Sequence, residues 1–521
     1  MFITGEDTSL QTRKKILDCK LLFCTVFAVG LLASCNPSTS APTTNSEPTT
    51  DPTSNPITSI PTTDTTTSDP TSEPSITVSQ GSINFDVYTL NDFHGATKYV
   101  EDTYPQIGLA KMSTIFNTFA EENTSFFISS GDMWQETIES NSNRGEYVTK
   151  AFNKIGLDAM TIGNHEFDWG AEYIVKNALV ADYPFLAANI REIETGYLLE
   201  NTLPSTIVEK DGIKVGIIGT IGPAQYNSIS YQQVASYEFE NEYKIVVDEA
   251  NYLREHGADV VILSAHDGYN SSDFGVLKKE MINEAKIDMV IAGHTHKKQS
   301  DIYVRNDGQE VPLIQAYSNG TAFGHVNFTF DTETKELEVN SYKVENFKDY
   351  AHYEEDPEII QLYKDNYDVD YLIGEEICEL KDNFSDSQVG ILAATAIYEK
   401  IKNSAEYADF NILTAYHNTG RKSMDKGTLT YEELFLSLPF DNEIIIYEVS
   451  SSYTKKGWNY VHSGFDYTKD FSGKRYVAGI DYIAYKTIKL EDGIRTGLYV
   501  RDIVEEYLRN KKVVTSSDYV N

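Results

Sequence analysis

The stretch TIGNHEFDWG, from Thr161 to Gly170, places Asn, His, Glu and Asp directly behind an apolar, β-branched lead-in and a glycine. Such a cluster costs desolvation free energy if it is buried, and it gains little if it is exposed. It is therefore either an ordinary polar loop or a site that serves a charged group. The surrounding sequence decides between these two interpretations.

Polar residues follow the other predicted strands in the same way. Strand-like runs cover residues 83–90, 125–132, 158–166, 213–220, 258–268 and 287–296, with helical patterns between them, for example at 107–119 and 147–155. Strands that alternate with helices predict a layered α/β fold. In open α/β sheets, ligands bind at the carboxyl ends of the strands, where these polar residues lie.

The polar residues at the strand ends offer carboxylate, imidazole and amide groups. They are Asp92, His94, Asp132, Asn164, His165, His266, His294 and His296. A mixed nitrogen and oxygen set suits Zn, Mn, Fe or Co better than Ca. The set is large enough for two metal ions that share a bridging carboxylate, and such a pair, roughly 3.5–4 Å apart, activates hydroxide and neutralises a phosphoryl group.

Each motif alone also fits an ordinary interpretation. The GHTH segment that holds His294 and His296 is compatible with a polar turn, His266 with a turn cap, and Asp132 in its Gly-Asp pair with a helix N-cap. Their occurrence together, at the strand ends of one α/β unit, favours the metal site. The histidines outside these motifs lack such surroundings and are predicted to be surface or structural residues: His256, His325, His352, His417 and His462.

The series NDFHG, GD, GNHEFD, AHDG and GHTH resembles the calcineurin-like metallophosphoesterase family. GNHEFD is typical of its branch of secreted bacterial 5′-nucleotidases and 2′,3′-cyclic-nucleotide phosphodiesterases, and the segments IGLAKM, PFLAANI and KVGIIGT fit the same branch. The likeness spans residues 83 to 345. It implies an α/β (α+β) fold in which a four-layer metallophosphoesterase sandwich is followed by a smaller 5′-nucleotidase C-terminal α/β domain.

The resemblance also implies roles for the strand-end residues. Seven of them would hold two divalent transition-metal ions: Asp92, His94 and His296 the first ion, Asn164, His266 and His294 the second, and Asp132 both. His165 would stabilise the transition state or protonate the leaving oxygen, and Asp168 would orient His165 through a hydrogen bond. An N-cap of the following helix is the alternative for Asp168, and Glu166 would serve packing or hydrogen bonds around the ligands.

The reaction that the resemblance implies is attack of metal-bound hydroxide on phosphorus. The formal net charge of the chain is -36, so the two cations would offset the repulsion that a phosphate dianion otherwise meets. The same charge argues against binding of nucleic-acid polymers, which requires clustered Lys and Arg.

A second unit follows the acidic, tyrosine-rich stretch 356–381, which is predicted to be helical. It contains a predicted helix at 389–402, a strand at 409–416, a helix at 431–436 and a strand at 443–449. The segment from ADFNILTAYHNTGR to LPFDNE resembles the nucleoside-binding C-terminal domain of 5′-nucleotidases. The substrate contacts that this resemblance implies are Asn418, Gly420, Arg421, Phe440, Asn442, Tyr476 and Asp481.

Three features of the second unit depart from that family pattern. HNTGR stands in place of a glycine-rich turn, YVAGIDY is an imperfect counterpart of the late aromatic and GGD element, and the helix at 389–402 carries only Lys400 and Lys402 where arginines are expected. A lysine cannot clamp phosphate in the bidentate manner of arginine. A core aromatic at the end of a strand is an equal alternative for Phe440.

The N-terminus has the pattern of an exported lipoprotein. Basic residues at 13–15 precede the apolar run LLFCTVFAVGLLA, which is too short to span a bilayer comfortably, and LLASC resembles a lipobox with Cys35 as the lipidated residue. Residues 36–80 are almost entirely Thr, Ser, Pro, Asn and Asp and predict a disordered tether. Cleavage at Cys35 would leave Cys378 as the only other cysteine, so no structural disulfide is expected.

These features predict four segments: a signal peptide at 1–35, a tether at 36–80, a catalytic domain at 81–350 and a substrate-binding domain at 351–521. We expect a monomer that is lipid-anchored to the outer face of a bacterial membrane and that releases phosphate from extracellular nucleotides as a 5′-nucleotidase. A 2′,3′-cyclic-nucleotide phosphodiesterase or UDP-sugar hydrolase of the same family is the alternative. A non-catalytic binding or adhesion lipoprotein is the alternative of another class.

Overall fold

The computed structural model describes residues 81–103, 105–268, 279–449, 460–466, 471–483 and 493–520. The predicted signal peptide, Cys35 and the tether lie outside these ranges. Among the described residues, no helix combines the length and the apolar character that crossing a membrane requires.

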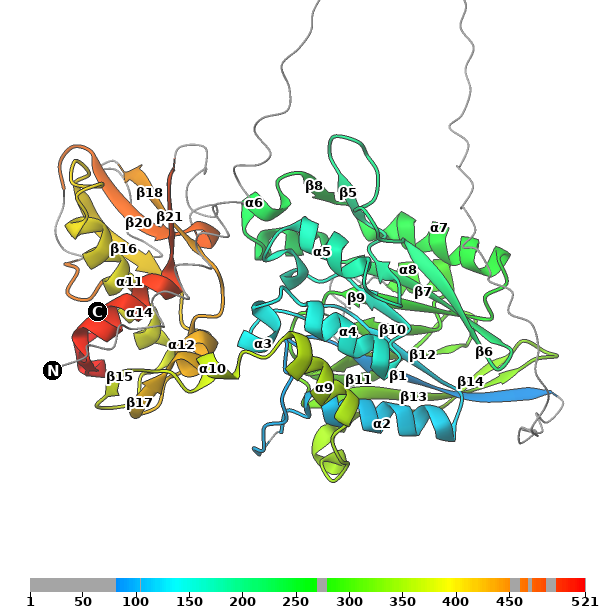
Figure 1. Cartoon of the computed structure of the whole chain (residues 1–521). Coiled ribbons are helices and arrows are strands. Elements are labelled where there is room, and N and C mark those ends of the chain that lie inside the picture. Colours follow the sequence, from blue (N-terminus) through cyan, green and yellow to red (C-terminus); the bar gives the residue numbers. More distant parts are fainter. Residues whose placement is uncertain are drawn as a thin grey trace, which may run out of the picture. The chain divides into compact units, whose positions relative to one another are not determined.

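Two six-stranded sheets form the centre of the first folded region (Figure 1). The first sheet has the order β14 (Leu337–Asn346), β13 (Ala322–Asp331), β1 (Ser82–Leu90), β2 (Ser125–Ser129), β3 (Ala159–Thr161), β4 (Phe185–Leu186). The second has the order β11 (Lys298–Val304), β12 (Glu310–Ala316), β10 (Met289–Ala292), β9 (Val260–His266), β7 (Ile213–Ile221), β6 (Ser205–Lys210). Strands β1 to β4 are parallel, and so are β7, β9, β10 and β12.

Helices cover the outer faces of both sheets. The helices packed on the first sheet are α2 (Gly108–Glu122), α4 (Glu146–Ile155), α5 (Ala171–Ala178) and α9 (Pro357–Asn366). The helices packed on the second are α7 (Glu242–Glu255) and α8 (Lys279–Ala285), and in Figure 1 they lie across the sheets from α2 and α9. The shorter elements are α3 (Ile138–Asn141), η1 (His165–Phe167), β5 (Ile190–Glu192), η2 (Pro223–Ser228), α6 (Tyr231–Val234), β8 (Tyr237–Phe239) and η3 (Phe347–Tyr350).

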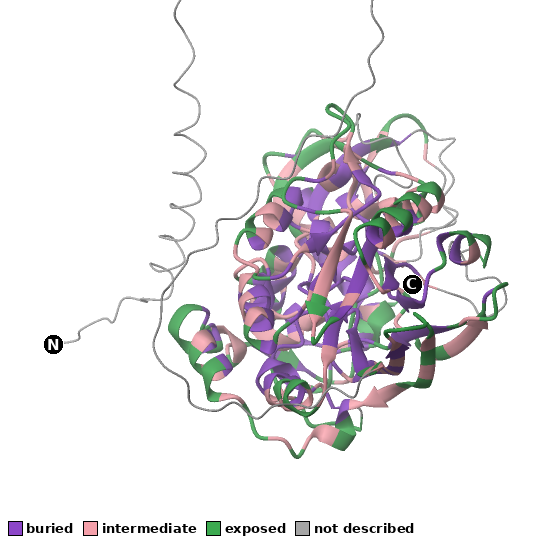
Figure 2. Ribbon diagram, turned by 90° about the vertical axis from the view of Figure 1, so that its right-hand side faces the viewer, coloured by how far each residue is buried: buried purple, intermediate pink, exposed green. Residues whose placement is uncertain are grey.

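The side-chain alternation of the strands explains this layering. In β1, Phe85 and Val87 belong to the core between the two sheets, whereas Tyr88 and Leu90 belong to the core under the helices. Successive side chains of a strand point to opposite faces, so a strand that is apolar at both sets of positions must be covered on both sides. Figure 2 shows the buried residues concentrated along the strands. The four-layer sandwich predicted from the sequence is therefore confirmed.

His325 links three strands of the first sheet. Its Nε2 lies 2.8 Å from Asp86 Oδ1 of β1, its Nδ1 lies 2.8 Å from Glu345 Oε1 of β14, and its ring stacks on Tyr88 with centroids 4.6 Å apart. Burial lowers the pKa of this imidazole, but the two carboxylates outweigh burial and raise it above its usual value. The residue is structural, as the sequence predicts.

The second folded region also consists of strands and helices. Its five-stranded sheet has the order β19 (Tyr460–Val461), β16 (Ile412–His417), β20 (Arg475–Ile480), β18 (Glu443–Val449), β21 (Ile494–Tyr499). A three-stranded sheet has the order β17 (Gly427–Thr430), β15 (Glu376–Leu380), β22 (Val513–Val514). The other elements are α10 (Asp370–Ile373), α11 (Asp386–Asn403), α12 (Tyr431–Ser437), α14 (Val500–Lys511) and η5 (Ser516–Asp518).

The structure corrects one prediction in this region. The stretch 356–381 is helical only in α9 and α10, and its last part is the strand β15, which pairs with β17 and β22. Two partner strands satisfy the backbone groups of β15, and this tertiary pairing overrides a local acidic pattern that resembles an exposed helix. Cys378 of β15 is buried and free, and burial raises the pKa of its thiol to about 11.

Candidate functional site

The polar residues at the strand ends meet at one place. Asp92 and His94 follow β1, Asp132 follows β2, Asn164 and His165 follow β3, His266 ends β9, and His294 and His296 follow β10. These strands run parallel within their sheets, and their carboxyl ends lie at a shared edge. Hydrogen bonds and short contacts join these residues directly to one another.

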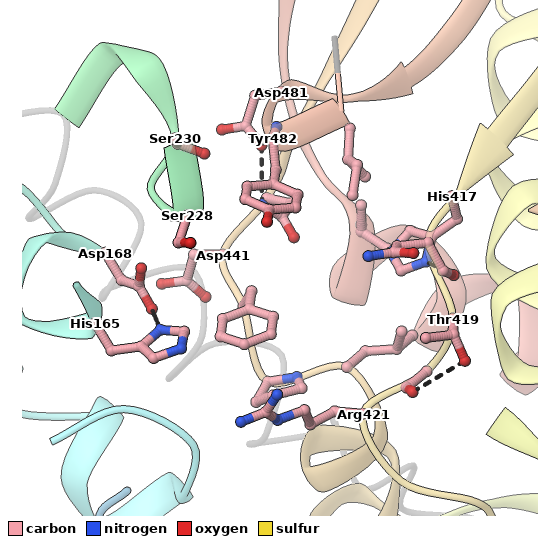
Figure 3. Close-up of a pocket in the computed structure, with 18 of the residues that line it drawn as sticks. His165, Asp168, Ser228, Ser230, His417, Thr419, Arg421, Asp441, Asp481 and Tyr482 are labelled. Carbon is pink, nitrogen blue, oxygen red and sulfur yellow. Dashed lines mark hydrogen bonds and ion pairs between the residues drawn. The ribbon is translucent and has the colours of Figure 1, made fainter. Parts of the chain in front are cut away.

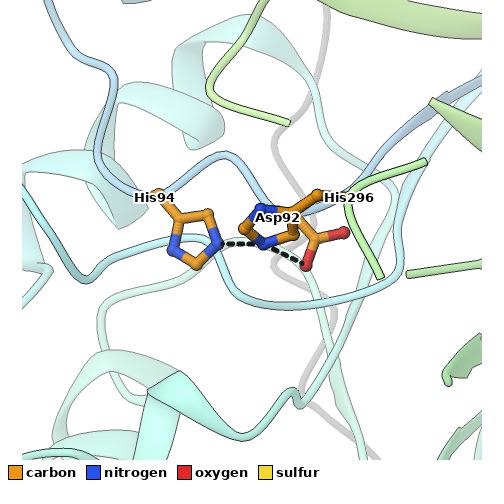
Figure 4. A group of neighbouring side chains, drawn as sticks. All are labelled: Asp92, His94 and His296. Carbon is orange, nitrogen blue, oxygen red and sulfur yellow. Dashed lines mark hydrogen bonds and ion pairs between the residues drawn. The ribbon is translucent and has the colours of Figure 1, made fainter. Parts of the chain in front are cut away.

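The first cluster consists of Asp92, His94 and His296 (Figure 4). The Nε2 atoms of His94 and His296 lie 2.9 Å apart, and His296 Nε2 lies 3.5 Å from Asp92 Oδ1. Asp92 and His94 are fully buried. Three potential ligand atoms therefore converge from β1 and β10.

The second cluster consists of Asp132, His266 and His294, and Asn164 joins it. His266 Nε2 lies 3.1 Å from both Asp132 Oδ2 and Asn164 Oδ1, and His294 Nδ1 lies 2.8 Å from the same Asn164 oxygen. The two clusters are in contact, because the backbone N–H of His294 donates to Asp92 Oδ1 over 3.0 Å.

The tautomer of His266 tests whether these residues fit a cation. Its Nδ1 lies 2.7 Å from the carbonyl oxygen of Ser130, which can only accept, so Nδ1 carries a hydrogen. In the neutral ring, Nε2 then presents a lone pair to two further acceptors, Asp132 and Asn164. Burial lowers the pKa of His266, but the Asp132 carboxylate outweighs burial and raises it to about 10, so without a metal ion a proton on Nε2 faces these two acceptors. Converging lone pairs of this kind attract a cation, and the donor set fits a divalent metal ion.

The backbone at the site is in an unusual conformation. Five of the predicted ligands have positive φ: Asp92 (48°), His94 (52°), Asp132 (56°), His294 (68°) and His296 (51°). Residues other than glycine adopt this region at a cost, and such residues cluster at functional sites. Position 163 also requires glycine, because a Cβ atom at this position would lie 2.3 Å from Asp132 Oδ1.

Two buried residues hold the ligand loops in place. Both oxygens of Glu166 accept hydrogen bonds from backbone N–H groups, those of Asp132, Met133 and Gly163, at 2.7–2.9 Å. Asn91 donates to Asp92 Oδ2 over 2.5 Å and accepts from the backbone N–H of Ala316 over 2.6 Å. Asn91 was not predicted as a site residue, although it stands next to Asp92 in the NDFHG motif.

His165 and Asp168 form a pair beside the clusters. His165 Nδ1 lies 2.7 Å from Asp168 Oδ2, and the backbone N–H of His165 donates to Asp132 Oδ1 over 2.8 Å. Burial lowers the pKa of His165, but Asp168 and Asp132 outweigh it and raise the pKa to about 9. Asp168 does not cap the next helix, since α5 begins after Gly170 and has no side-chain cap.

A cavity of about 300 Å³ lies next to this pair. Figure 3 shows His165 and Asp168 on one side of it and His417 and Thr419 on the other. Six of the predicted substrate contacts line it: Asn418, Gly420, Arg421, Phe440, Asn442 and Asp481. The ring of Phe440 is stacked on that of His165, with centroids 5.5 Å apart and planes inclined by 10°.

Tyr476 is not among the residues that line the cavity. It lies near the start of β20, pairs with Ile412 and contacts Phe410, with ring centroids 4.8 Å apart. Tyr482 lines the cavity instead, one residue after Asp481. Burial raises the pKa of Asp481 to about 6, and its Oδ1 accepts from Asn442 Nδ2 over 2.9 Å and from the backbone N–H of Tyr482 over 2.8 Å.

His417 was predicted to be a surface or structural residue, but it lines the cavity. Its Nδ1 lies 2.7 Å from the carbonyl oxygen of Asn418, so Nδ1 donates and Nε2 keeps its lone pair. Burial lowers the pKa of the ring to about 4, so it is neutral at physiological pH. Its position directly before Asn418 in HNTGR was the available sequence signal.

Comparison with known proteins is consistent with this geometry. Residues 85–298 match the family model for calcineurin-like phosphoesterase. A snake venom 5′-nucleotidase from Crotalus adamanteus is 27% identical over 439 residues, which cover 74% of this chain and 71% of that protein. A 5′-nucleotidase from Vibrio parahaemolyticus is 25% identical over 415 residues, with coverage of 69% and 71%. The crystal structure of a 5′-nucleotidase precursor from Thermus thermophilus is similar in fold, with a TM-score of 0.66, 20% identity and coverage of 83% and 97%.

Proposed function

We propose, from the calcineurin-like phosphoesterase domain that residues 85–298 form, that this chain is a metal-dependent phosphoric monoester hydrolase of the 5′-nucleotidase type. The observation that supports this most strongly is the convergence of two ligand clusters beside the His165–Asp168 pair, at the wall of a cavity. Binding alone does not require a histidine with an oriented proton next to the metal ligands.

Two divalent transition-metal ions (Zn, Mn, Fe or Co) are the proposed cofactors. Asp92, His94 and His296 would hold one ion, Asn164, His266 and His294 the other, and Asp132 would lie between them. When bound, two such ions supply positive charge to the phosphoryl oxygens and acidify a water molecule. Glu166 and Asn91 hold the loops that carry Asp132 and Asp92 through hydrogen bonds.

His165 is the proposed proton donor for the leaving oxygen. Its Nδ1 faces the carboxylate of Asp168, so the hydrogen on Nδ1 donates to that carboxylate. Nε2 takes no part in this hydrogen bond. With a pKa of about 9, the ring is protonated at neutral pH and Nε2–H can donate. Asp168 acts through His165, because it fixes the ring and stabilises its positive charge.

The cavity is the proposed site of the nucleoside part of the substrate. Arg421 would contact phosphate, Phe440 would stack on the base, and Asp481 and Asn442 would accept or donate hydrogen bonds. Stacking of a base on an aromatic ring contributes about 1–3 kcal/mol. The names of the relatives from venom and Vibrio support a 5′-nucleotide as substrate. A 2′,3′-cyclic nucleotide and a UDP-sugar are the alternatives.

The N-terminal pattern supports an exported enzyme. Lipidation at Cys35 and a tether over 36–80 would hold the catalytic domain (81–350) and the substrate-binding domain (351–521) as a monomer at the outer face of a bacterial membrane. There the enzyme would act on extracellular nucleotides and release nucleoside and phosphate.

Chromatographic analysis of the products from a substrate panel tests the function, because a 5′-nucleotide yields nucleoside and phosphate, a cyclic nucleotide yields a nucleoside monophosphate, and a UDP-sugar yields UMP and a sugar phosphate. Purified protein with Mn²⁺, Co²⁺ or Zn²⁺ is compared on 5′-nucleotides, 2′,3′-cyclic nucleotides and UDP-sugars, with and without chelator and with Asp132→Ala. We expect metal-dependent release that is fastest from 5′-nucleotides and is lost in the variant. Nucleotide binding without turnover of any substrate would instead support a non-catalytic binding lipoprotein.

A further inference from the structure

Glu136 is buried in a strained conformation close to the metal ligands. Its φ is +135°, a value that glycine adopts readily and other residues adopt only with strain, and its exposed fraction is 8%. The backbone is held there by Asn141, whose Oδ1 accepts from the N–H of Glu136 over 3.1 Å.

The carboxylate of Glu136 touches two parts of the proposed site. Its Oε1 forms an ion pair with the Nη2 of Arg421, a residue that lines the cavity. The same oxygen lies 3.5 Å from Nδ1 of His94, on the side of the ring away from His296. Glu136 is thus the one described carboxylate that contacts both a predicted metal ligand and the cavity arginine.

We propose that Glu136 is a positioning residue that holds His94 and Arg421 at the same time. Nδ1 of His94 also lies 3.2 Å from the carbonyl oxygen of Gln135. This oxygen and the Glu136 carboxylate are both acceptors, so together they favour a hydrogen on Nδ1. Nε2 is then free to bind metal. Carboxylates that contact the outer nitrogen of a ligating histidine have this effect in metal sites.

The same contact prepares Arg421 for an anion. A guanidinium has five N–H donors, and Glu136 pairs with one of its nitrogens, so the remaining donors stay available to the oxygens of a phosphate. An arginine that is already held loses less side-chain entropy on binding. This part of the inference rests on the proposed function, which assigns the phosphate to Arg421.

Metal affinity tests the contact with His94. Metal-free protein is titrated with Mn²⁺ by calorimetry for the wild type, Glu136→Gln and the matched control Glu139→Gln. Glu139 is buried three residues away, and its carboxylate pairs with Lys98. We expect Glu136→Gln to weaken Mn²⁺ binding by about 10- to 100-fold, with the control within twofold of the wild type. Equal affinities for all three proteins would overturn the proposal.

Binding of inorganic phosphate to Mn²⁺-saturated protein tests the contact with Arg421. We expect Glu136→Gln and Arg421→Gln each to weaken phosphate binding, and the double variant to be no weaker than the worse single variant, because the two residues act as a unit. Arg421→Gln should leave Mn²⁺ affinity unchanged. Tighter phosphate binding by Glu136→Gln would overturn the proposal, since it would mean that Glu136 competes with the ligand for Arg421.

Thermal unfolding gives an independent readout. Glu136→Gly removes the strain together with the carboxylate, so we expect a higher melting temperature than for Glu136→Gln, with the same losses in Mn²⁺ and phosphate affinity. A lower melting temperature would contradict the strain on which the inference is based. All three readouts are made without turnover, so a protein that binds Mn²⁺ and phosphate but hydrolyses no nucleotide would refute the proposed function and still decide the role of Glu136.

Discussion

Replacing Asp168 with asparagine removes the negative charge that faces His165 and keeps the shape of the side chain. The hydrogen bond between them is 2.7 Å long, and the two side chains are only 15% and 16% exposed, so water cannot replace the lost charge fully. An amide beside Nδ1 also offers an N–H group, which favours the tautomer with its hydrogen on Nε2 but leaves the ring neutral. His165 then loses both its orientation and its positive charge.

The magnitude follows from the strength of that bond. A hydrogen bond to a charged group contributes about 1.5–3 kcal/mol, and each ~1.4 kcal/mol corresponds to a factor of ten in rate. If the bond is made fully in the transition state, kcat falls by roughly 10- to 150-fold. The Michaelis constant should change little, because Asp168 lies beside His165, across the cavity from His417 and Thr419 (Figure 3).

Steady-state kinetics on a 5′-nucleotide, together with a Mn²⁺ titration, measure both quantities. The matched control is Glu172→Gln, which removes a carboxylate from the first turn of the neighbouring helix α5. We expect unchanged Mn²⁺ affinity in Asp168→Asn and unchanged kinetics in the control. A variant with wild-type kcat, or one whose loss is explained entirely by weaker metal binding, would refute the role of Asp168 as the residue that orients His165.

Further predictions concern the cavity, the metal centre and stability. Phe440→Ala should raise the Michaelis constant for 5′-nucleotides by roughly 5- to 150-fold, because one stacking contact is lost. Tyr476→Ala should leave the constant unchanged, since that ring lies outside the cavity lining. Equal effects of the two substitutions would contradict the cavity assignment. His417→Leu removes a neutral hydrogen-bond acceptor from the cavity and should raise the Michaelis constant roughly 2- to 12-fold at constant kcat. The control for His417→Leu is His462→Gln, because burial lowers the pKa of the His462 imidazole to about 4 and this ring lies outside the cavity lining. Dialysis against chelator should lower the melting temperature in scanning calorimetry, because bound metal stabilises the folded state by about 4 kcal/mol at a thousandfold excess over Kd; an unchanged melting temperature would contradict metal binding. His325 has a folded-state pKa above its value of 6.5 in the unfolded chain, so its stabilisation is complete below pH 6.5 and is lost as pH rises through the folded pKa. Denaturant unfolding should show that His325→Gln removes this decline, and a parallel pH dependence in wild type and variant would refute the assignment.

The predicted ligands converge in the structure because each follows or ends a strand and the ends of these strands meet. Residues 83–90 and 125–132 hold neighbouring parallel strands of the first sheet, so the polar residues that follow them lie at one edge, whereas 258–268 holds β9 of the second sheet. Hydrophobic periodicity locates the strands, but their direction and the meeting of the two sheets are long-range properties, so the occurrence of the motifs together had to support the prediction. The four-layer sandwich was predicted from the family resemblance, and strands that are apolar at both sets of positions agree with it, because they need cover on both faces.

The cavity depends on information of another kind. Tyr476 lies near the start of β20 and Tyr482 follows its end, and only the pairing of β20 with β16 and β18 decides which end of the strand reaches the cavity. The strand prediction alone does not contain that pairing, since direction and register are set by partners far apart in the chain. His417 was missed for the same reason, because loops distant in sequence make its environment.

The backbone conformation of the site is the feature that the sequence pattern predicts least. A sequence shows that Asp92, His94, Asp132, His294 and His296 are polar and follow strands, but not that all five take left-handed backbone angles. Each such residue has an unfavourable backbone conformation, which an ordinary polar loop does not need. Glu136 repeats the pattern beside the same ligands, with a buried carboxylate instead of a ligand atom. Selection for stability alone would replace it with glycine, so its presence argues that the contact with His94 and Arg421 is worth more to the protein than the strain it costs.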